Sequence, residues 1–235
     1  MLLREERIMG PTYSALDGTR PRPPVLGALG YLLSNLPLGV AGFALMVTLF
    51  TAGLGTAIVW VGLPVLGLAV LIARAAGRFE RARVHRMLGT YVVTPYKLLP
   101  EFGLRARWRA RLTDGATWRD ALYLVLLLPL GIAEFTIMVV FWSVGLAATA
   151  LPFYCQYLPG GAYFFPSGDA RWIVVDSPVD ALPWAALGLG VVAVAISVTR
   201  ALGTAHALFA RAMLGPGPRA RRLAESATDQ PNTVA

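Results

Sequence analysis

The chain carries the same thirteen-residue phrase twice, and this repeat is the strongest constraint on its fold. Tyr31–Phe43 and Tyr123–Phe135 are identical at eight positions, including a Leu-Pro-Leu-Gly element in each. A second repeated phrase follows each copy, since Arg74–Gly89 aligns with Arg200–Gly215 at six positions. Self-similarity of this kind indicates a tandem duplication, in which each copy forms one equivalent structural unit.

The two copies differ in length. The offset between matching residues is 92 in the first phrase and 126 in the second, so the second copy holds about 34 extra residues. These extra residues fall in an insertion at 152–183, which we call the flap.

Long uncharged runs place both copies in a membrane. Hydrophobic residues make up 56% of the chain and charged residues 14%, whereas soluble domains carry about 25% charged residues. Leu26–Ile72 has no charged residue over 47 positions, which is enough for two membrane spans of about 20 residues each. We therefore predict an all-α integral membrane protein with four transmembrane helices, arranged as two parallel-duplicated hairpins. The helices are expected at about 28–52, 56–75, 120–149 and 182–205.

The chain then divides into five segments. The hairpins occupy 26–89 and 120–215, with a basic linker at 90–119 between them. The polar ends, 1–25 and 216–235, are expected to be disordered. Within the first hairpin the glycine-rich Ala52–Gly55 is expected to form the turn, and the second helix is expected to continue to Leu88, with Gly89 as its stop. A matching cytoplasmic extension of the fourth helix is expected at Arg200–Leu214, and it contains His206.

The positions of the basic residues predict the orientation. Of 21 lysines and arginines, all except Arg171 lie on one side of the predicted spans, and the positive-inside rule makes that side cytoplasmic. We expect a multi-pass protein of the cell membrane with both termini in the cytoplasm. The two copies then have the same orientation, which weakens an interpretation as a transporter built from inverted repeats.

The basic residues indicate contact with lipid and not with nucleic acid, although the net charge is +8. In membrane proteins, cytoplasmic arginines set the topology and contact anionic headgroups. The expected surface is a lipid-facing patch, with a docking patch for a protein partner as the alternative. Its candidate residues are Arg74, Arg78, Arg81, Arg105, Arg107, Arg109 and Arg111.

Catalytic and metal-binding motifs are missing from the sequence, so we expect no enzyme activity, no cofactor and no metal. The two histidines, His85 and His206, are interpreted as surface or interface residues. Cys155 is the single cysteine, which excludes an internal disulfide.

Glu134 is the only charged residue in the long apolar run Ala121–Gly168, which contains most of the third predicted span, and Gly42 is its counterpart in the first copy. A carboxylate in a membrane is costly, so it should face another helix or a water-filled cavity. No lysine, arginine or histidine is expected in the other spans to pair with it, and we expect its neighbour near Gly42 or Ser34. Two interpretations stay open, which are a polar contact between helices and a proton- or ligand-binding site.

The flap is the part that could meet a stimulus outside the cell. Arg171–Val175 is expected to form a short strand within it. Its aromatic residues indicate an interfacial belt, with a ligand pocket as the alternative. The candidate residues are Tyr154, Tyr157, Tyr163, Phe164, Phe165, Asp169, Arg171, Trp172 and Asp176.

Three segments, taken in order, carry a family resemblance. They are LGYLLSNLPLGVAGF, WRDALYLVLLLPLGIAEF and VVDSPVDALPWAALG, and the similarity extends over about residues 26–215. In these segments the chain resembles the sensor domain family of actinobacterial membrane proteins. The resemblance implies a four-helix input module, which is often fused to two-component histidine kinases and also occurs alone. It implies no particular ligand.

The expected function follows from the resemblance together with the missing kinase motifs. We expect a stand-alone, non-enzymatic sensor that passes an envelope or membrane stimulus to a separate protein partner, which could be a kinase, a regulator or a transporter subunit. One alternative is an accessory subunit of a membrane transport complex, and another is a proton- or lipid-handling protein that uses Glu134. A homo-oligomer is compatible with each of these.

Overall fold

The computed structural model describes residues 23–96, 103–157, 163–165, 173–175 and 177–217. Its four long helices are α1 (Val25–Gly55), α2 (Gly62–Leu88), α4 (Gly115–Tyr154) and α5 (Leu182–Leu214). The shorter elements are η2 (Ala57–Val59), α3 (Leu104–Thr113), η3 (Cys155–Tyr157), β1 (Tyr163–Phe165) and β2 (Ile173–Val175). All four long helices are long and apolar enough to cross a membrane, which confirms the predicted all-α membrane class.

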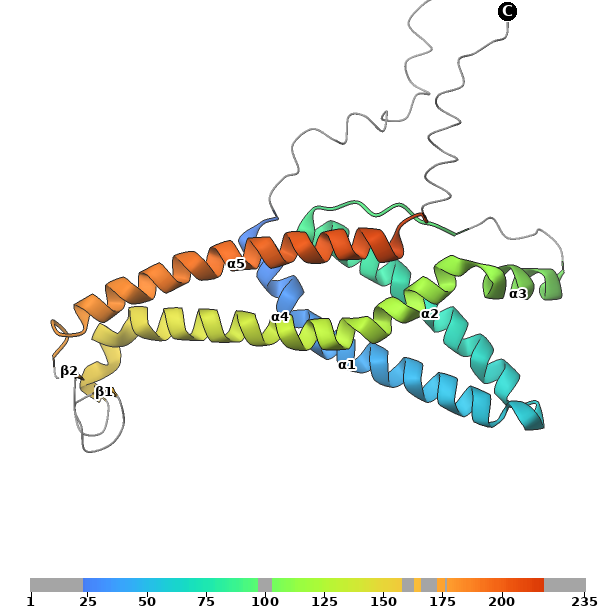
Figure 1. The fold of residues 1–235 in the computed structure, drawn as a ribbon, viewed down its shortest axis with the longest axis horizontal. Helices are drawn as coiled ribbons and strands as arrows, with labels where there is room; N and C mark the ends of the chain where they lie inside the picture. The colour runs from blue at the N-terminus through green and yellow to red at the C-terminus, as the bar shows by residue number, and fades with distance from the viewer. Residues whose placement is uncertain (1–22, 97–102, 158–162, 166–172, 176, 218–235) are drawn as a thin grey trace, which may run out of the picture.

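The molecule consists of two helical hairpins that meet at a shared centre (Figure 1). The first is α1 with α2, and the second is α4 with α5; the hairpins extend from the centre in different directions. Helix α1 packs mainly on α4, and α4 in turn packs on α5. The largest apolar core lies where the four helices meet, around Leu32, Val84, Leu88, Leu127 and Leu214.

The turn of the first hairpin lies later in the chain than expected. Helix α1 continues through Ala52–Gly55, and the chain reverses at 56–61, where Trp60 adopts a left-handed conformation with φ 65°. The glycines serve close packing of the two helices, because a Cβ on Gly62 would lie 2.0 Å from the carbonyl oxygen of Gly53. The expected turn at 52–55 and helix start at 56 were therefore wrong.

Helix α3 was not anticipated from the sequence, because its alternating arginines and small residues give no apolar stripe. Arginine and alanine are nevertheless strong helix formers. Asp114 separates α3 from α4 and caps α4, accepting a hydrogen bond from the Ala116 amide at 3.1 Å. Helix α4 consequently begins five residues before the expected position 120.

The ends of α2 and α5 extend beyond the expected spans. Helix α2 ends at Leu88, followed by Gly89 with φ 66°, as the sequence predicts. Helix α5 continues to Leu214, which includes the extension expected at Arg200–Leu214. His206 lies in this extension, which packs against the other three long helices.

The described part of the flap contains a two-stranded antiparallel ladder in which Tyr163 pairs with Val175. Strand β2 coincides with the end of the strand expected at 171–175. Val175 is buried beside Leu151, Cys155 and Ala181, which holds β2 against the ends of α4 and α5. The candidate residues Asp169, Arg171, Trp172 and Asp176 lie outside the described residues, as do both chain ends at 1–22 and 218–235.

Equivalent glycines of the two copies make equivalent contacts where α1 crosses α4. A Cβ on Gly39 would lie 2.8 Å from the carbonyl oxygen of Leu127. A Cβ on its counterpart Gly131 would lie 2.7 Å from the carbonyl oxygen of Asn35, the counterpart of Leu127. This reciprocity supports the proposed duplication and brings the backbones of α1 and α4 together.

Candidate functional site: a buried polar centre between the hairpins

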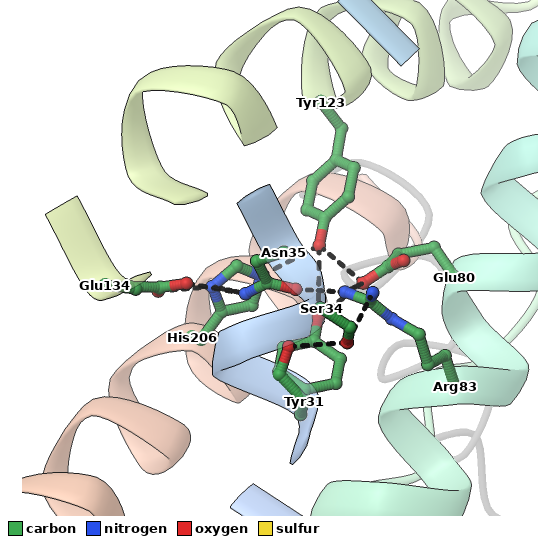
Figure 2. Close-up of polar contacts among 8 residues, drawn as sticks. All are labelled: Tyr31, Ser34, Asn35, Glu80, Arg83, Tyr123, Glu134 and His206. Atoms are coloured by element: carbon green, nitrogen blue, oxygen red, sulfur yellow. Dashed lines mark hydrogen bonds and ion pairs between the residues drawn. The ribbon is translucent and has the colours of Figure 1, made fainter. Parts of the chain in front are cut away.

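Polar side chains from all four long helices converge beside the α1–α4 crossing, and we call this group the polar centre (Figure 2). All of its members except Ser34 are buried. The polar centre comprises Tyr31, Ser34 and Asn35 on α1, Glu80 and Arg83 on α2, Tyr123 and Glu134 on α4, and His206 on α5.

Glu134 faces the interior of the bundle, where it has two polar partners. His206 Nδ1 lies 2.6 Å from Glu134 Oε1, and Asn35 Nδ2 donates to Glu134 Oε2 at 2.5 Å. Asn35 immediately follows Ser34, near which a neighbour was expected. Gly42, the other expected neighbour, packs instead on the side chain of Leu124.

One expectation about these residues was wrong, because Glu134 does have a basic partner, His206. Of the two interpretations of His206, the structure favours an interface residue, since its side chain is only 2% exposed. The extension of α5 packs inside the bundle and carries His206 to the level of Glu134. The other histidine, His85, is exposed and contacts the ring of Tyr91 edge-on.

Glu80 receives donors from three helices. The Tyr31 hydroxyl donates a hydrogen bond to Glu80 Oε1, and the Tyr123 hydroxyl lies 3.0 Å from the same oxygen. Arg83 forms an ion pair with Glu80 at 3.0 Å, one turn farther along α2. Three donors on one oxygen satisfy a carboxylate that would otherwise be costly to bury.

Tyr123 connects the two carboxylates of the polar centre. Its hydroxyl oxygen is 3.0 Å from Glu80 Oε1 and 2.9 Å from His206 Nε2. The contacts therefore form a continuous chain from Glu134 on α4, through His206 on α5 and Tyr123, to Glu80 on α2.

Arg83 joins α2 to α1. Its guanidinium donates to the side-chain oxygens of Asn35 and Ser34, and it stacks over the ring of Tyr31 at 4.1 Å from the centroid. Because Asn35 also donates to Glu134, its amide links the Arg83–Glu80 pair with the Glu134–His206 pair.

The polar centre therefore contains two carboxylates, one guanidinium and one imidazole in a buried position. Removing one partner from such a group leaves an uncompensated buried charge, which costs about 3–5 kcal/mol. Among the described residues, no group of three or more His, Cys, Asp and Glu side chains is arranged to hold a metal ion. The geometry suits holding and moving protons between oxygen and nitrogen atoms more than it suits ligation.

A second polar group fastens α2 to the start of α4. Arg81 pairs with Asp120 at 2.7 Å, and Arg74 contacts Asp114 at 3.4 Å and Thr117 at 2.9 Å. Tyr96 lies over both guanidinium groups and contacts Asp120 Oδ2 at 2.5 Å. Burial, aided by the hydrogen bond to the Asp120 carboxylate, raises the pKa of Tyr96 to about 12.

These ion pairs divide the basic patch expected from the sequence. Arg74 and Arg81 are buried against acidic residues of the linker and α4 and do not present their charge at a surface. Arg78 of α2 is exposed, as are Arg105, Arg107 and Arg109 of α3, and Arg111 is half-buried beside Trp108. From the sequence all seven arginines were assigned to one basic patch. The acidic partners of Arg74 and Arg81 could not be recognised there, because they lie some 40 residues away along the chain.

The flap residues within the described ranges lie at the far end of the second hairpin (Figure 1). Tyr154 is half-buried, and its hydroxyl donates to the Ala147 carbonyl at 3.1 Å. Tyr157 is exposed on η3. Tyr163, Phe164 and Phe165 form strand β1. None of the described contacts brings the flap into the polar centre.

The repeat alignment passes directly through the polar centre. Tyr31 and Tyr123 are counterparts in the first phrase, and Glu80 and His206 are counterparts in the second. Arg83 corresponds to Phe209, and these two also act alike, since Arg83 stacks on Tyr31 and Phe209 stacks on Tyr123 with ring centroids 5.5 Å apart. Sequence reasoning missed this site, although the two repeated tyrosines and the aligned Glu80 and His206 were its signal.

Comparison with known proteins adds one finding. Neither a search of curated proteins nor a search of solved structures gives a match to this chain. A family model described as "Putative sensor" matches residues 31–214, a range that begins at the first tyrosine of the polar centre and ends with α5. On this match, the chain belongs to the Putative sensor family.

Proposed function

We propose that this protein is a non-enzymatic membrane sensor that passes a stimulus from the membrane or envelope to a separate protein. The observation that carries the proposal is the polar centre, to which each of the four long helices contributes a side chain. Family membership supports a sensory role. The stimulus would act by changing how the two hairpins pack.

The polar centre makes that packing sensitive to small movements. Glu80 depends on donors from α1 and α4, and Glu134 depends on donors from α1 and α5. A shift of one hairpin against the other breaks some of these contacts, and each buried group left unpaired costs about 1–3 kcal/mol or more. Two packings separated by a few kcal/mol are what a ligand or stimulus needs in order to shift a population.

The paired ends of α2 and α5 are the proposed output. Arg81 Nε donates to the Leu214 carbonyl at 3.0 Å, so the two ends lie together and both connect directly to the polar centre. Arg86 and its counterpart Ala212 are exposed there. A partner that contacts both ends would detect a change in their separation.

The proposed location is the cell membrane, with both termini in the cytoplasm. The one-sided distribution of basic residues supports this orientation. The exposed arginines of α3 would then contact anionic headgroups, and the flap would face outward, where a stimulus could reach it.

Labelling of single cysteines tests the orientation. In a Cys155→Ala background, Val179→Cys should react with an impermeant thiol reagent in intact cells, and Thr113→Cys should react only after lysis. Both positions are exposed. Reaction of Thr113→Cys alone in intact cells would reverse the proposed orientation.

Co-purification from mild detergent tests the signalling role. The tagged wild-type chain should retain a protein partner after crosslinking in cells. Arg83→Met, which breaks the polar centre, should change the yield of that crosslink, whereas the exposed Arg78→Met on the same helix should leave it unchanged. A partner bound equally by all three proteins, and identified as a transport subunit, would favour an accessory role over sensing.

A further inference from the structure

The number of protons available to Tyr123 limits the hydrogen-bond patterns that the polar centre can adopt. A phenol hydroxyl carries one proton, yet the Tyr123 oxygen lies within bonding distance of both Glu80 Oε1 and His206 Nε2. If Tyr123 donates to Glu80, then Nε2 must carry its own proton and donate to Tyr123. If Nε2 is unprotonated, Tyr123 must donate to it, and Glu80 loses a donor.

The contact with Glu134 fixes the other side of the imidazole. His206 Nδ1 lies 2.6 Å from Glu134 Oε1, so one proton must lie between these atoms. All contacts are satisfied together when both ring nitrogens carry protons, or when the Nδ1 proton has passed to Glu134. Both arrangements contain the same number of protons, and the exchangeable proton is shared by Glu134 and His206.

The polar centre is electrically neutral only when this shared proton is present. Glu80 and Glu134 contribute two negative charges, and Arg83 and protonated His206 contribute two positive ones. The other titratable groups that face His206 are Tyr123 from α4 and Tyr31 from α1, whose ring lies 5.0 Å from the imidazole centroid. Loss of one proton leaves a net negative charge in a buried site, which is unfavourable.

We propose that the polar centre binds one exchangeable proton between Glu134 and His206, and that loss of this proton moves the Tyr123 hydroxyl from Glu80 to His206. Glu80 is on α2 and His206 is on α5, so the switch weakens the connection between the hairpins. Imidazole exchanges its proton near neutral pH. All of these hydrogen bonds therefore form together at low pH, and the bond between Tyr123 and Glu80 is lost as the pH rises. This inference rests on the proposed sensory function and names the proton as its input.

Nuclear magnetic resonance of His206 tests the proton directly. The chain has two histidines, so His85→Gln leaves His206 as the sole source of ¹⁵N-histidine signals. In lipid nanodiscs, both ring nitrogens should be protonated near pH 5, and one proton should be lost by about pH 9. Adding Glu134→Gln should reduce the population of doubly protonated imidazole at a given pH, because the imidazolium loses its anionic partner.

Distances between spin labels test the mechanical consequence. Labels at Arg86→Cys and Ala212→Cys in a Cys155→Ala background report the separation of α2 and α5. Their distance distribution should change over the pH range in which His206 titrates. The change should persist with His85→Gln and disappear with His206→Gln.

Tyr123→Phe provides a second variant, in case His206→Gln does not fold. It should keep the titration of His206 but lose the pH-dependent change in distance, because the hydroxyl that switches is missing. Absence of titration between about pH 5 and pH 9 would overturn the inference. So would a distance change that survives in Tyr123→Phe. Suppose that either result is obtained while Arg83→Met still changes the yield of the partner crosslink. The proton is then rejected as the input, and the proposed sensory function is retained.

Discussion

The two hairpins share their backbone contacts but differ in the chemistry placed on them. Gly77 of the first hairpin packs on Asp120, and its counterpart Gly203 packs on Ala28, the counterpart of Asp120. Asp120 is paired with Arg81, whereas Ala207 occupies the place of Arg81 in the second hairpin. Small residues thus set the approach of the helices at both equivalent contacts, and an ion pair is present at only the α2–α4 contact.

The same contrast appears beside the two repeated tyrosines. A guanidinium covers Tyr31, while a phenyl ring covers Tyr123. The first hairpin therefore supplies the permanent positive charge of the polar centre, and the second supplies an imidazole that can gain or lose its charge. The two sequence repeats thus contribute a fixed charge and a variable charge to one site.

The largest expected effect comes from removing the fixed charge. Arg83→Met should lower the free energy of unfolding by about 3–5 kcal/mol, because Glu80 then stays buried without its cation. The counterpart change, Phe209→Met, should cost less than about 1.5 kcal/mol, since it exchanges one apolar side chain for another. Unfolding in mixed micelles measures both, and equal costs would show that the two halves do not differ in this way.

Making the α2–α4 contact resemble its counterpart, the α5–α1 contact, should cost less than breaking its ion pair. Arg81→Ala and Asp120→Ala should each cost about 3 kcal/mol, because each leaves a buried partner charge. The double variant reproduces Ala207 and Ala28 and should be more stable than either single variant. The exposed Arg78→Ala is the control, with an expected change within about 0.5 kcal/mol. Additive costs in the double variant would contradict the comparison.

The shared backbone contacts should respond alike in both halves. Gly39→Ala and Gly131→Ala should each cost about 1–3 kcal/mol, because the new methyl group meets a carbonyl of the opposite helix. Gly190 has no heavy atom within 4 Å of a Cβ position, so Gly190→Ala should be neutral or slightly stabilising. Thermal unfolding of the three variants gives the comparison, and an effect at only one of the two crossing glycines would reject their equivalence.

The repeated tyrosines should differ by a smaller amount. Tyr123 contacts both Glu80 and His206, while Tyr31 donates to Glu80. Tyr123→Phe should therefore cost about 1 kcal/mol more than Tyr31→Phe, which corresponds to one additional hydrogen bond. Unfolding experiments on the two variants at one pH measure this difference, and the reverse order would place the more important hydroxyl in the first copy.

The smallest expected effect concerns Tyr96, which belongs to the ionic group at the α2–α4 contact. Its pKa is raised to about 12 in the folded protein, so the folded state binds the phenol proton more tightly than the unfolded state. The stability that this provides is present below pH 10 and is lost as the pH rises toward 12. Tyr96→Phe should show a weaker decline over this interval, and parallel declines would assign the effect to other groups.

The sequence was sufficient to predict the four long helices, because long apolar runs define them without reference to tertiary contacts. It also predicted that Glu134 would face a neighbouring helix. It did not predict His206 as the partner, because the sequence does not show how a helical extension beyond an apolar run packs against the other helices. Asn35 and Glu80 were missed for a related reason, since their partners lie 99 and 43 residues away in the chain.

The unbroken length of α4 gives the polar centre a mechanical advantage. Gly131 contacts the α1 backbone and can serve as a fulcrum, with Tyr154 about 35 Å away on one side and Tyr123 about 12 Å away on the other, at 1.5 Å per residue. On such a lever, a sideways displacement of about 3 Å at the flap end becomes about 1 Å at Tyr123. A hydrogen bond of 3.0 Å does not survive that displacement. The flap end of α4 can therefore act on the proton of the polar centre without touching it.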